Sequence, residues 1–270
     1  MERSCPGRGY AEQGVKELIL VAQETTVYGK DLYGKKSLHI LLKKLCEIRG
    51  IRWIRILYCY PEEIYDELIE TIRDEKKICH YLDIPIQHAS DHILKRMGRR
   101  TSKQELIDIV GKLRKEIPDI VLRTTLITGF PGETEEDHEE LKEFVDEMEF
   151  DRLGVFTYSP EENTPAAEMA DQVPEEVKEE RRDELMELQQ EISYDRGQDR
   201  IGQELLVMIE GKVADESAYI GRTYGDAPKV DGYIFVQTGE LLMTGDFAKV
   251  RVTGALEYDL IGVLSDEYTE

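Results

Sequence analysis

Polar residues and glycines gather where the apolar runs of this sequence end, and these are the positions that could hold a ligand. The clearest instance is VLRTTLITGFPGETEEDHEEL, from Val121 to Leu141. Its β-branched run leads into a turn with Gly129 and Gly132, followed by carboxylates that suit a helix start. In an α/β protein such a turn lies at the carboxyl end of a strand, where ligand sites gather. An ordinary strand-to-helix connection explains the same residues, so both interpretations stay open.

Metal and nucleophile chemistry is less well supported by the remaining residues. His88 and His92 are four apart, but no third ligand stands in register with them, so no metal site is predicted. Cys46 and Cys79 fall where packing residues belong. Cys59 follows a strand-like run and could line a pocket, although a lone thiol there is more often packing. No phosphate loop or dinucleotide fingerprint occurs, and no catalytic acid or base is assigned.

The elements that must position these residues alternate between strand and helix. This alternation predicts an α/β fold with a parallel sheet, most simply an open or partial barrel. Its ligand site should lie at the carboxyl ends of the strands. The predicted strands cover residues 15–22, 53–58, 80–86, 120–128 and 152–158. The predicted helices cover residues 38–48, 62–72, 91–97, 102–113, 133–148 and 175–194, with Ser102 and Glu105 as a capping box.

The sequence changes character after Gly197. Short strand-like runs at 205–210, 218–222, 233–237 and 248–253 are separated by glycine-containing turns. This spacing predicts a small antiparallel barrel. We therefore expect an irregular lead-in at 1–13, an α/β domain at 14–200, a barrel at 201–266 and a mobile tail at 267–270.

The charge of the chain limits the classes of partner that it can bind. Lysine and arginine number 35 against 57 aspartates and glutamates, a net charge of −22. With no basic run apparent to compensate, nucleic acid is a poor default partner, whereas a basic protein or a small molecule is acceptable. Scattered cysteines, no secretory signal and no apolar run of membrane length predict a soluble cytoplasmic protein.

Four long motifs give the sequence a family resemblance. The segments Val21–Gly34, Tyr81–Arg99, Arg123–Asp137 and Phe150–Ala166 resemble the radical S-adenosylmethionine (SAM) methylthiotransferases. The closing barrel resembles the TRAM domain of that family. Residues 221–232 and 254–262 are most similar to the RimO type, whose substrate is an aspartate of small-subunit ribosomal protein twelve. The alternative is the MiaB type, which modifies a tRNA adenosine. From residue 201 onward five basic residues face 13 acidic ones, so tRNA is unlikely and a basic ribosomal protein is favoured.

The resemblance implies a partial (βα)6 barrel, SAM and two [4Fe-4S] clusters. One cluster would cleave SAM to a radical that takes hydrogen from the aspartate β-carbon, and the other would take part in sulfur delivery. The protein would hold and shield the cofactor. By position in the family motifs, the cofactor-binding residues would be Gln23 and Thr25 near the amino-acid portion, Gln87 and Ser90 near the ribose, and Arg123, Thr125, Glu133, Phe156 and Tyr158.

The sequence departs from the family pattern at the cluster. The family binds its radical cluster through C-x-x-x-C-x-x-C after the first strand, and these 270 residues contain neither that loop nor that strand, nor the domain with the second cluster. Cys5 stands alone, whereas a [4Fe-4S] cluster needs close-set thiolates. We therefore expect a RimO-type chain that is incomplete and inactive. The alternative is a cluster-less module that only binds a ribosomal protein; no oligomeric state is predicted.

Overall fold

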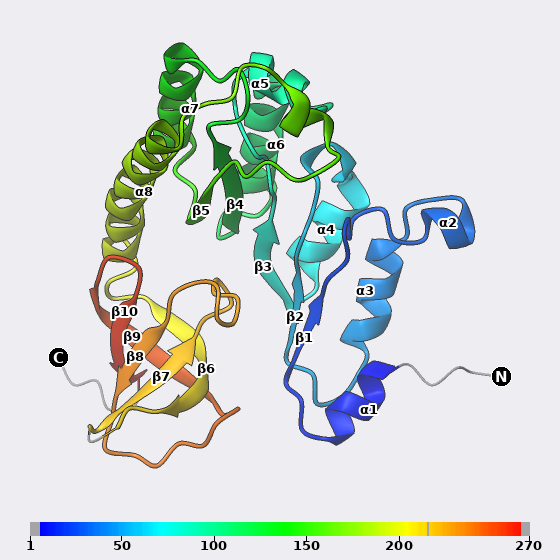
Figure 1. The fold of residues 1–270 in the computed structure, drawn as a ribbon. Coiled ribbons are helices and arrows are strands. Elements are labelled where there is room, and N and C mark those ends of the chain that lie inside the picture. The colour runs from blue at the N-terminus through cyan, green and yellow to red at the C-terminus, as the bar shows by residue number, and fades with distance from the viewer. Residues whose placement is uncertain (1–5, 215, 266–270) are drawn as a thin grey trace.

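A five-stranded parallel sheet forms the first part of the computed structural model, which describes residues 6–214 and 216–265 (Figure 1). The strands lie side by side in sequence order, and every neighbouring pair is parallel. They are β1 (Glu17–Leu20), β2 (Trp53–Ile56), β3 (Ile78–Asp83), β4 (Val121–Thr128) and β5 (Arg152–Thr157). The predicted strands and their parallel arrangement are thus confirmed, with ends that differ by a few residues.

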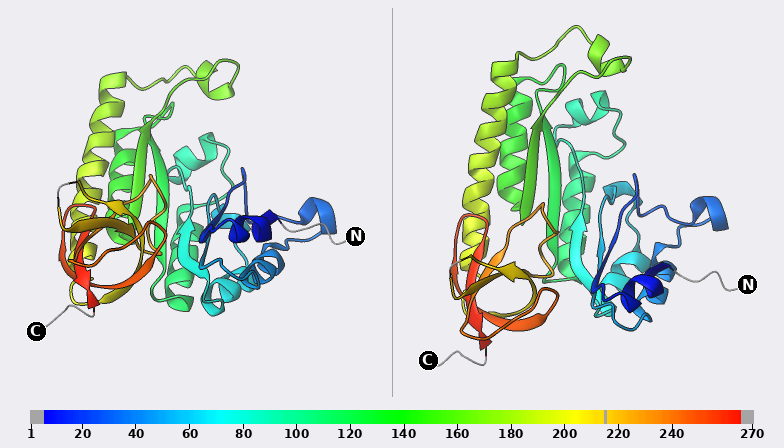
Figure 2. Two further views of the ribbon diagram at one scale, coloured as in Figure 1. Left: turned by 90° about the horizontal axis from the view of Figure 1, so that it is seen from below. Right: turned by 60° about the horizontal axis from the view of Figure 1, so that its bottom comes forward.

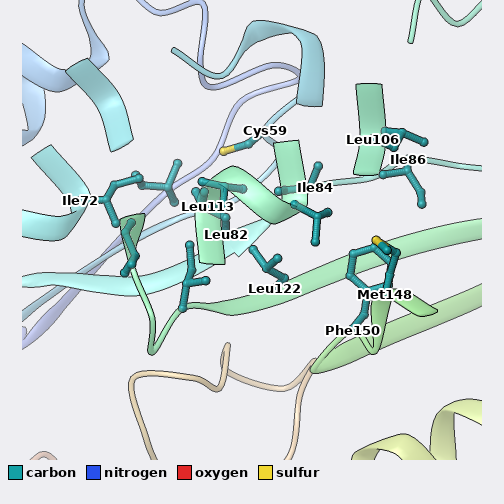
Figure 3. Close-up of a cluster of buried hydrophobic side chains, with 14 of the residues drawn as sticks. Cys59, Ile72, Leu82, Ile84, Ile86, Leu106, Leu113, Leu122, Met148 and Phe150 are labelled. Atoms are coloured by element: carbon teal, nitrogen blue, oxygen red, sulfur yellow. The ribbon is translucent and has the colours of Figure 1, made fainter. Parts of the chain in front are cut away.

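The helices between the strands cover one face of the sheet (Figures 1 and 2). They are α3 (Leu38–Cys46), α4 (Asp66–Asp74), α5 (Asp91–Arg96), α6 (Lys103–Glu116) and α7 (Glu135–Met148), with a 3₁₀ turn, η1 (Pro61–Glu63), before α4. Their apolar sides pack on strand residues such as Leu82 and Leu122 in one continuous core (Figure 3). The predicted capping box of Ser102 and Glu105 begins α6.

The other face of the sheet is concave and carries the charged strand residues Asp83, Arg123 and Arg152. The register places Asp83 beside Arg123, and Arg123 beside Arg152. Because side chains alternate between the faces of a strand, Arg123 and Thr125 point to the face opposite the core residues Leu122 and Leu126. This face is where a ligand can meet functional groups from several strands.

Two short helices were not predicted. Residues 6–12 were expected to be irregular, but Pro6–Glu12 forms α1. Its Gly7 lies close to the core, because a Cβ there would be only 3.0 Å from Ile48 Cδ1. Packing against the core therefore orders a segment with no clear apolar period, and residues 1–5 lie outside the described part. The second helix, α2 (Lys30–Tyr33), lies in the loop after β1.

A long helix, α8 (Glu175–Gln198), follows the 3₁₀ turn η2 (Pro165–Glu168) and leads from the sheet to a closed barrel (Figure 1). The barrel consists of β6 (Glu204–Lys212), β7 (Ala218–Arg222), β8 (Ile234–Gln237), β9 (Phe247–Ala255) and β10 (Leu260–Leu264). The expected all-antiparallel barrel is corrected to a mixed one, because β10 pairs with β8 in parallel. The strand β10 was not among the predicted strands, although its five residues are mostly apolar. The predicted tail, 267–270, lies outside the described residues.

The barrel packs on the amino-terminal half of the concave face. Trp53, Tyr81 and Val121 of the sheet share a small apolar cluster with Met208 and Ala227 of the barrel. The carboxyl ends of the strands lie at the other end of the sheet from the barrel (Figure 1). Among the described residues, no helix is long and apolar enough to cross a membrane.

Candidate functional site

Residues from three neighbouring strands meet at the carboxyl edge of the concave face. Gln87, just beyond β3, donates its backbone N–H to Thr125 O (3.0 Å) and accepts one from Ile127 (2.8 Å). Ile127 lies opposite Phe156 of β5 in the sheet register, and the Phe156 ring is 59% exposed. The Tyr158 N–H donates to Thr128 O at the end of β4 (2.8 Å). Four of the predicted cofactor residues, Gln87, Thr125, Phe156 and Tyr158, therefore belong to one edge of β3 to β5.

Two of the predicted cofactor residues at this edge each have a buried polar atom without a hydrogen-bond partner in the described part of the chain. The Gln87 Oε1 atom and the Tyr158 hydroxyl have no hydrogen-bond partner among the described residues. The Gln87 backbone has φ of 73°, an uncommon value for a residue with a side chain. A buried polar group without a partner is costly, so a ligand with donors and acceptors would relieve this cost. The exposed Phe156 ring offers such a ligand an apolar surface.

A second group, beyond β1 and β2, lies farther along the edge. Gln23 is exposed, whereas Thr25 is buried and donates its hydroxyl to Leu57 O (2.6 Å). Sequence reasoning missed Glu24, which accepts from the backbone N–H groups of Thr26 (2.8 Å) and Tyr60 (2.8 Å). Burial raises the pKa of Glu24 in spite of these hydrogen bonds. Glu24 thus joins the loops after β1 and β2.

Glu133 has both carboxylate oxygens engaged within the protein. Its Oε2 accepts from the N–H groups of Gly129 (2.7 Å) and Phe130 (3.2 Å), and its Oε1 accepts from Arg181 of α8 (2.9 Å). The Glu133 side chain is 0% exposed. It therefore shapes the turn between β4 and α7 from within, and a role at the cofactor would be one of positioning.

Gly129 in this turn cannot be replaced without strain. It has φ of +68°, and a Cβ would lie 2.1 Å from Lys178 Cγ. We expect Gly129→Ala to lower the free energy of unfolding by about 2–4 kcal/mol, measured by urea denaturation. Gly34→Ala is the matched control, because Gly34 has φ of +71° but open space around it, and should cost only about 1 kcal/mol. Equal losses of unfolding free energy in the two variants would show that the clash with Lys178 adds nothing to the cost of Gly129→Ala.

Ser90 also has an internal partner. It is buried before α5 and donates its hydroxyl to Asp137 Oδ1 of α7 (2.5 Å). Asp137 further accepts from the backbone N–H of Thr134 (3.0 Å) and contacts His92 Nδ1 (3.0 Å). Burial raises the pKa of Asp137, but the hydrogen bonds from Ser90, Thr134 and His92 outweigh it and lower the pKa to about 2. Ser90 and Asp137 together join α5 to the start of α7.

This depressed pKa predicts a pH-dependent contribution to stability. The folded-state pKa of Asp137 lies below the ordinary aspartate value, so its stabilisation is present above about pH 4 and is lost as the pH falls towards 2. We expect Asp137→Asn to cost about 1–2 kcal/mol at pH 7, with the difference from wild type shrinking below pH 4. Urea unfolding at several pH values measures this. Asp146→Asn, exposed on the same helix, should have little effect at any pH.

Arg123 is held in a row of charges that reaches the barrel. Its guanidinium donates to Asp83 (2.7 Å) and lies 3.5 Å from Asp231 of the barrel. It also lies 3.4 Å from the Thr125 hydroxyl. Arg123 can therefore present one positive group beside Thr125 while its position stays fixed by carboxylates on both sides.

The cysteines of the described residues do not gather into a group that could hold a metal ion. Cys46, Cys59 and Cys79 are free thiols, and Cys5 lies outside the described residues. Burial raises the pKa of Cys46 to about 11 and that of Cys79 to about 12, and raises that of Cys59 as well. Thiolates are the ligands that such clusters need. In 6–214 and 216–265, no three histidine, cysteine or acidic residues are placed to hold a metal ion.

Sequence models of two known families match this chain. The Radical SAM superfamily model matches residues 8–145, and the TRAM domain model matches residues 201–264. The first covers the sheet up to α7, and the second covers the barrel.

Relatives with assigned names match both parts. The chain is 68% identical over 252 residues to "Ribosomal protein uS12 methylthiotransferase RimO" of Lachnoclostridium phytofermentans, covering 93% of this chain and 57% of that protein. It is 55% identical over 260 residues to the protein of the same name from Clostridium botulinum, covering 96% of this chain and 58% of that one. The chain therefore spans less than two thirds of the length of these relatives.

The fold itself is similar to a solved radical SAM structure. Coproporphyrinogen III oxidase (HemN) from Escherichia coli superposes with a TM-score of 0.55 at 16% identity, over 92% of this chain and 61% of that one. At so low an identity the likeness concerns the fold alone.

Proposed function

Because this chain belongs to the radical SAM superfamily, we propose that it serves in a RimO-type reaction, the methylthiolation of an aspartate β-carbon in ribosomal protein uS12. The observation that carries the proposal is the 68% identity to a protein named for that reaction, which runs through both the sheet and the barrel. The polar atoms of Gln87 and Tyr158 at the strand ends, which have no hydrogen-bond partner within 6–214 and 216–265, support a cofactor site there.

The residues at the carboxyl edge fit SAM. Gln87 Oε1 and the Tyr158 hydroxyl would receive polar groups of the ligand, and Phe156 would pack on its flat ring. Gln23 and Thr25 would lie near the amino-acid portion, while Ser90, Arg123, Thr125 and Glu133 would position the pocket walls. When bound together with a reduced [4Fe-4S] cluster, SAM would supply the radical chemistry that removes hydrogen from an unactivated carbon.

The described residues do not fit a [4Fe-4S] cluster, so we propose that these 270 residues bind SAM without cleaving it. The test is anaerobic reconstitution with iron and sulfide, followed by assay for 5′-deoxyadenosine. We expect no cleavage. Stoichiometric iron and sulfide together with 5′-deoxyadenosine would refute the proposal.

The protein substrate would dock on the acidic barrel. From residue 201 onward 13 acidic residues stand against five basic ones, which suits a basic ribosomal protein better than tRNA. Free thiols at Cys46, Cys59 and Cys79 are consistent with the reducing cytoplasm. A pull-down with purified uS12 should show association that weakens with salt. Stronger retention of tRNA would favour the MiaB-type alternative.

A second candidate is a binding module that docks the ribosomal protein and performs no chemistry. The lack of a thiolate set among the described residues favours it. The two candidates differ in one measurement. A pure binding module should retain uS12 but show no saturable binding of SAM.

A further inference from the structure

One segment of this acidic chain is strongly basic. Residues 28–52 contain seven lysines and arginines and two acidic residues, a net charge of +5, whereas the whole chain has −22. The rest of the chain therefore carries −27. The segment comprises the loop after β1, with α2, and then α3. The helices α2 and α3 lie on the side of the molecule away from the barrel (Figure 1), whereas Arg52 at the end of the segment contacts the Phe247 ring of the barrel.

A groove runs between the loop and α3. It has a volume of about 330 Å³, and the residues that matter here are Tyr28, Tyr33, Lys35, Ile40 and Lys44. The Tyr33 ring is 62% exposed, and Ile40 is 38% exposed. The groove thus combines aromatic and apolar surface with two lysines at its sides.

The lysines around the groove are available to a ligand. Lys30, Lys35 and Lys44 are exposed and have no ion pair with any residue in 6–214 or 216–265. Lys36, by contrast, is paired with Glu63 (2.7 Å). Because the Debye length is about 10 Å at 0.1 M salt, the charges of the segment itself, seven basic against two acidic, contribute more to the field in the groove than the acidic surface of the barrel does.

The loop holds its aromatic ring in place. The Ser37 N–H donates to Tyr28 O (2.7 Å) and closes the loop at its base, and the Tyr33 N–H donates to Gly29 O (2.7 Å). Gly29 and Gly34, both left-handed, border the single turn of α2. Because the loop is closed in this way, Tyr33 would lose little conformational entropy when a ligand binds.

From this arrangement we propose that the groove between residues 28–37 and α3 binds single-stranded RNA. Sites for single-stranded nucleic acid combine two elements. Lysines bind the phosphates of the backbone, and an exposed aromatic ring stacks on a base. An acidic peptide would use the lysines but has no need of Tyr33. The molecule would then offer an acidic barrel to a basic protein on one side and a basic groove to RNA on the other.

Fluorescence anisotropy with a labelled single-stranded RNA of about 12 nucleotides tests the proposal without SAM or a ribosomal protein. Its failure is therefore separate from a failure of the proposed function. We expect a Kd between about 10⁻⁶ and 10⁻⁴ M. K35Q/K44Q should weaken binding about tenfold and reduce the slope of log K against log salt by about 1.4. Tyr33→Ala should weaken binding about fivefold, and Tyr33→Phe should retain it.

K95Q/K115Q is the matched control, since it removes the same charge from exposed positions away from the groove. It should bind RNA like wild type, and circular dichroism should show all variants folded. The proposal is overturned if RNA does not bind, or if both double variants weaken binding equally. It is also overturned if a poly-glutamate peptide of equal charge binds as tightly as RNA and Tyr33→Ala has no effect.

Discussion

Glu133→Ala should lower the free energy of unfolding by about 3–5 kcal/mol, because it leaves the Arg181 guanidinium buried without its main partner. Arg181 is 6% exposed, and its NH1 lies 2.9 Å from Glu133 Oε1. The same substitution removes the acceptor of the Gly129 and Phe130 N–H groups. We therefore expect the turn to loosen and SAM binding to weaken together with stability.

The control for this variant is Glu135→Ala. Glu135 contacts the same arginine (3.1 Å), but its side chain is 70% exposed. An exposed ion pair contributes at most about 1 kcal/mol, so the loss should be small. The double variant Glu133→Ala/Arg181→Met should be more stable than Glu133→Ala alone, since no buried charge remains unpaired. Urea denaturation measures all three, and equal losses for Glu133→Ala and Glu135→Ala would contradict the account.

Arg222→Met should also cost about 3–5 kcal/mol, because Arg222 joins the barrel to the sheet from a buried position. Its guanidinium donates to Glu17 of β1 (2.7 Å), to Asp226 O (2.8 Å) and to Glu210 (2.8 Å). Glu17 in turn accepts from the fully buried Arg55 (2.8 Å). Loss of Arg222 leaves this network incomplete at the contact between the two parts.

The chain has a built-in probe for this variant. Trp53 is its single tryptophan, is buried at the contact and lies 4.9 Å from the Phe247 ring of the barrel. We expect Arg222→Met to shift the urea midpoint of Trp53 fluorescence below that of the circular dichroism signal, because the barrel separates first. Lys249→Gln, which removes an exposed barrel ion pair to Glu204, should leave the two transitions together. A Trp53 signal unchanged in Arg222→Met would count against a coupling role.

Much of the fold could be predicted from sequence periodicity. Buried parallel strands appear as continuous apolar runs, and the capping box at Ser102 fixed a helix start. Local patterns could not predict α1 or the parallel pairing of β10 with β8, since both depend on contacts with distant residues.

The position of the site could be predicted from the sequence, but the contacts that each side chain makes there could not. Gln87 and Tyr158 each have a buried polar atom at the strand ends that no described residue hydrogen-bonds, as we expect where a ligand binds. Glu133 and Ser90 instead have internal partners, Arg181 and Asp137, that lie more than 40 residues away in the chain. Such pairs cannot be predicted from local spacing. The basic segment at 28–52 was also missed, because the net charge of the whole chain is strongly negative.

The central claim is that the carboxyl edge of the sheet is a SAM site, and equilibrium dialysis of the chain with labelled SAM tests it most directly. We expect saturable binding of one SAM per chain, competed by S-adenosylhomocysteine. Tyr158→Phe should weaken it because the variant lacks the hydroxyl that has no partner among the described residues. No saturable binding by the folded chain, or binding unchanged by the competitor, would contradict the account.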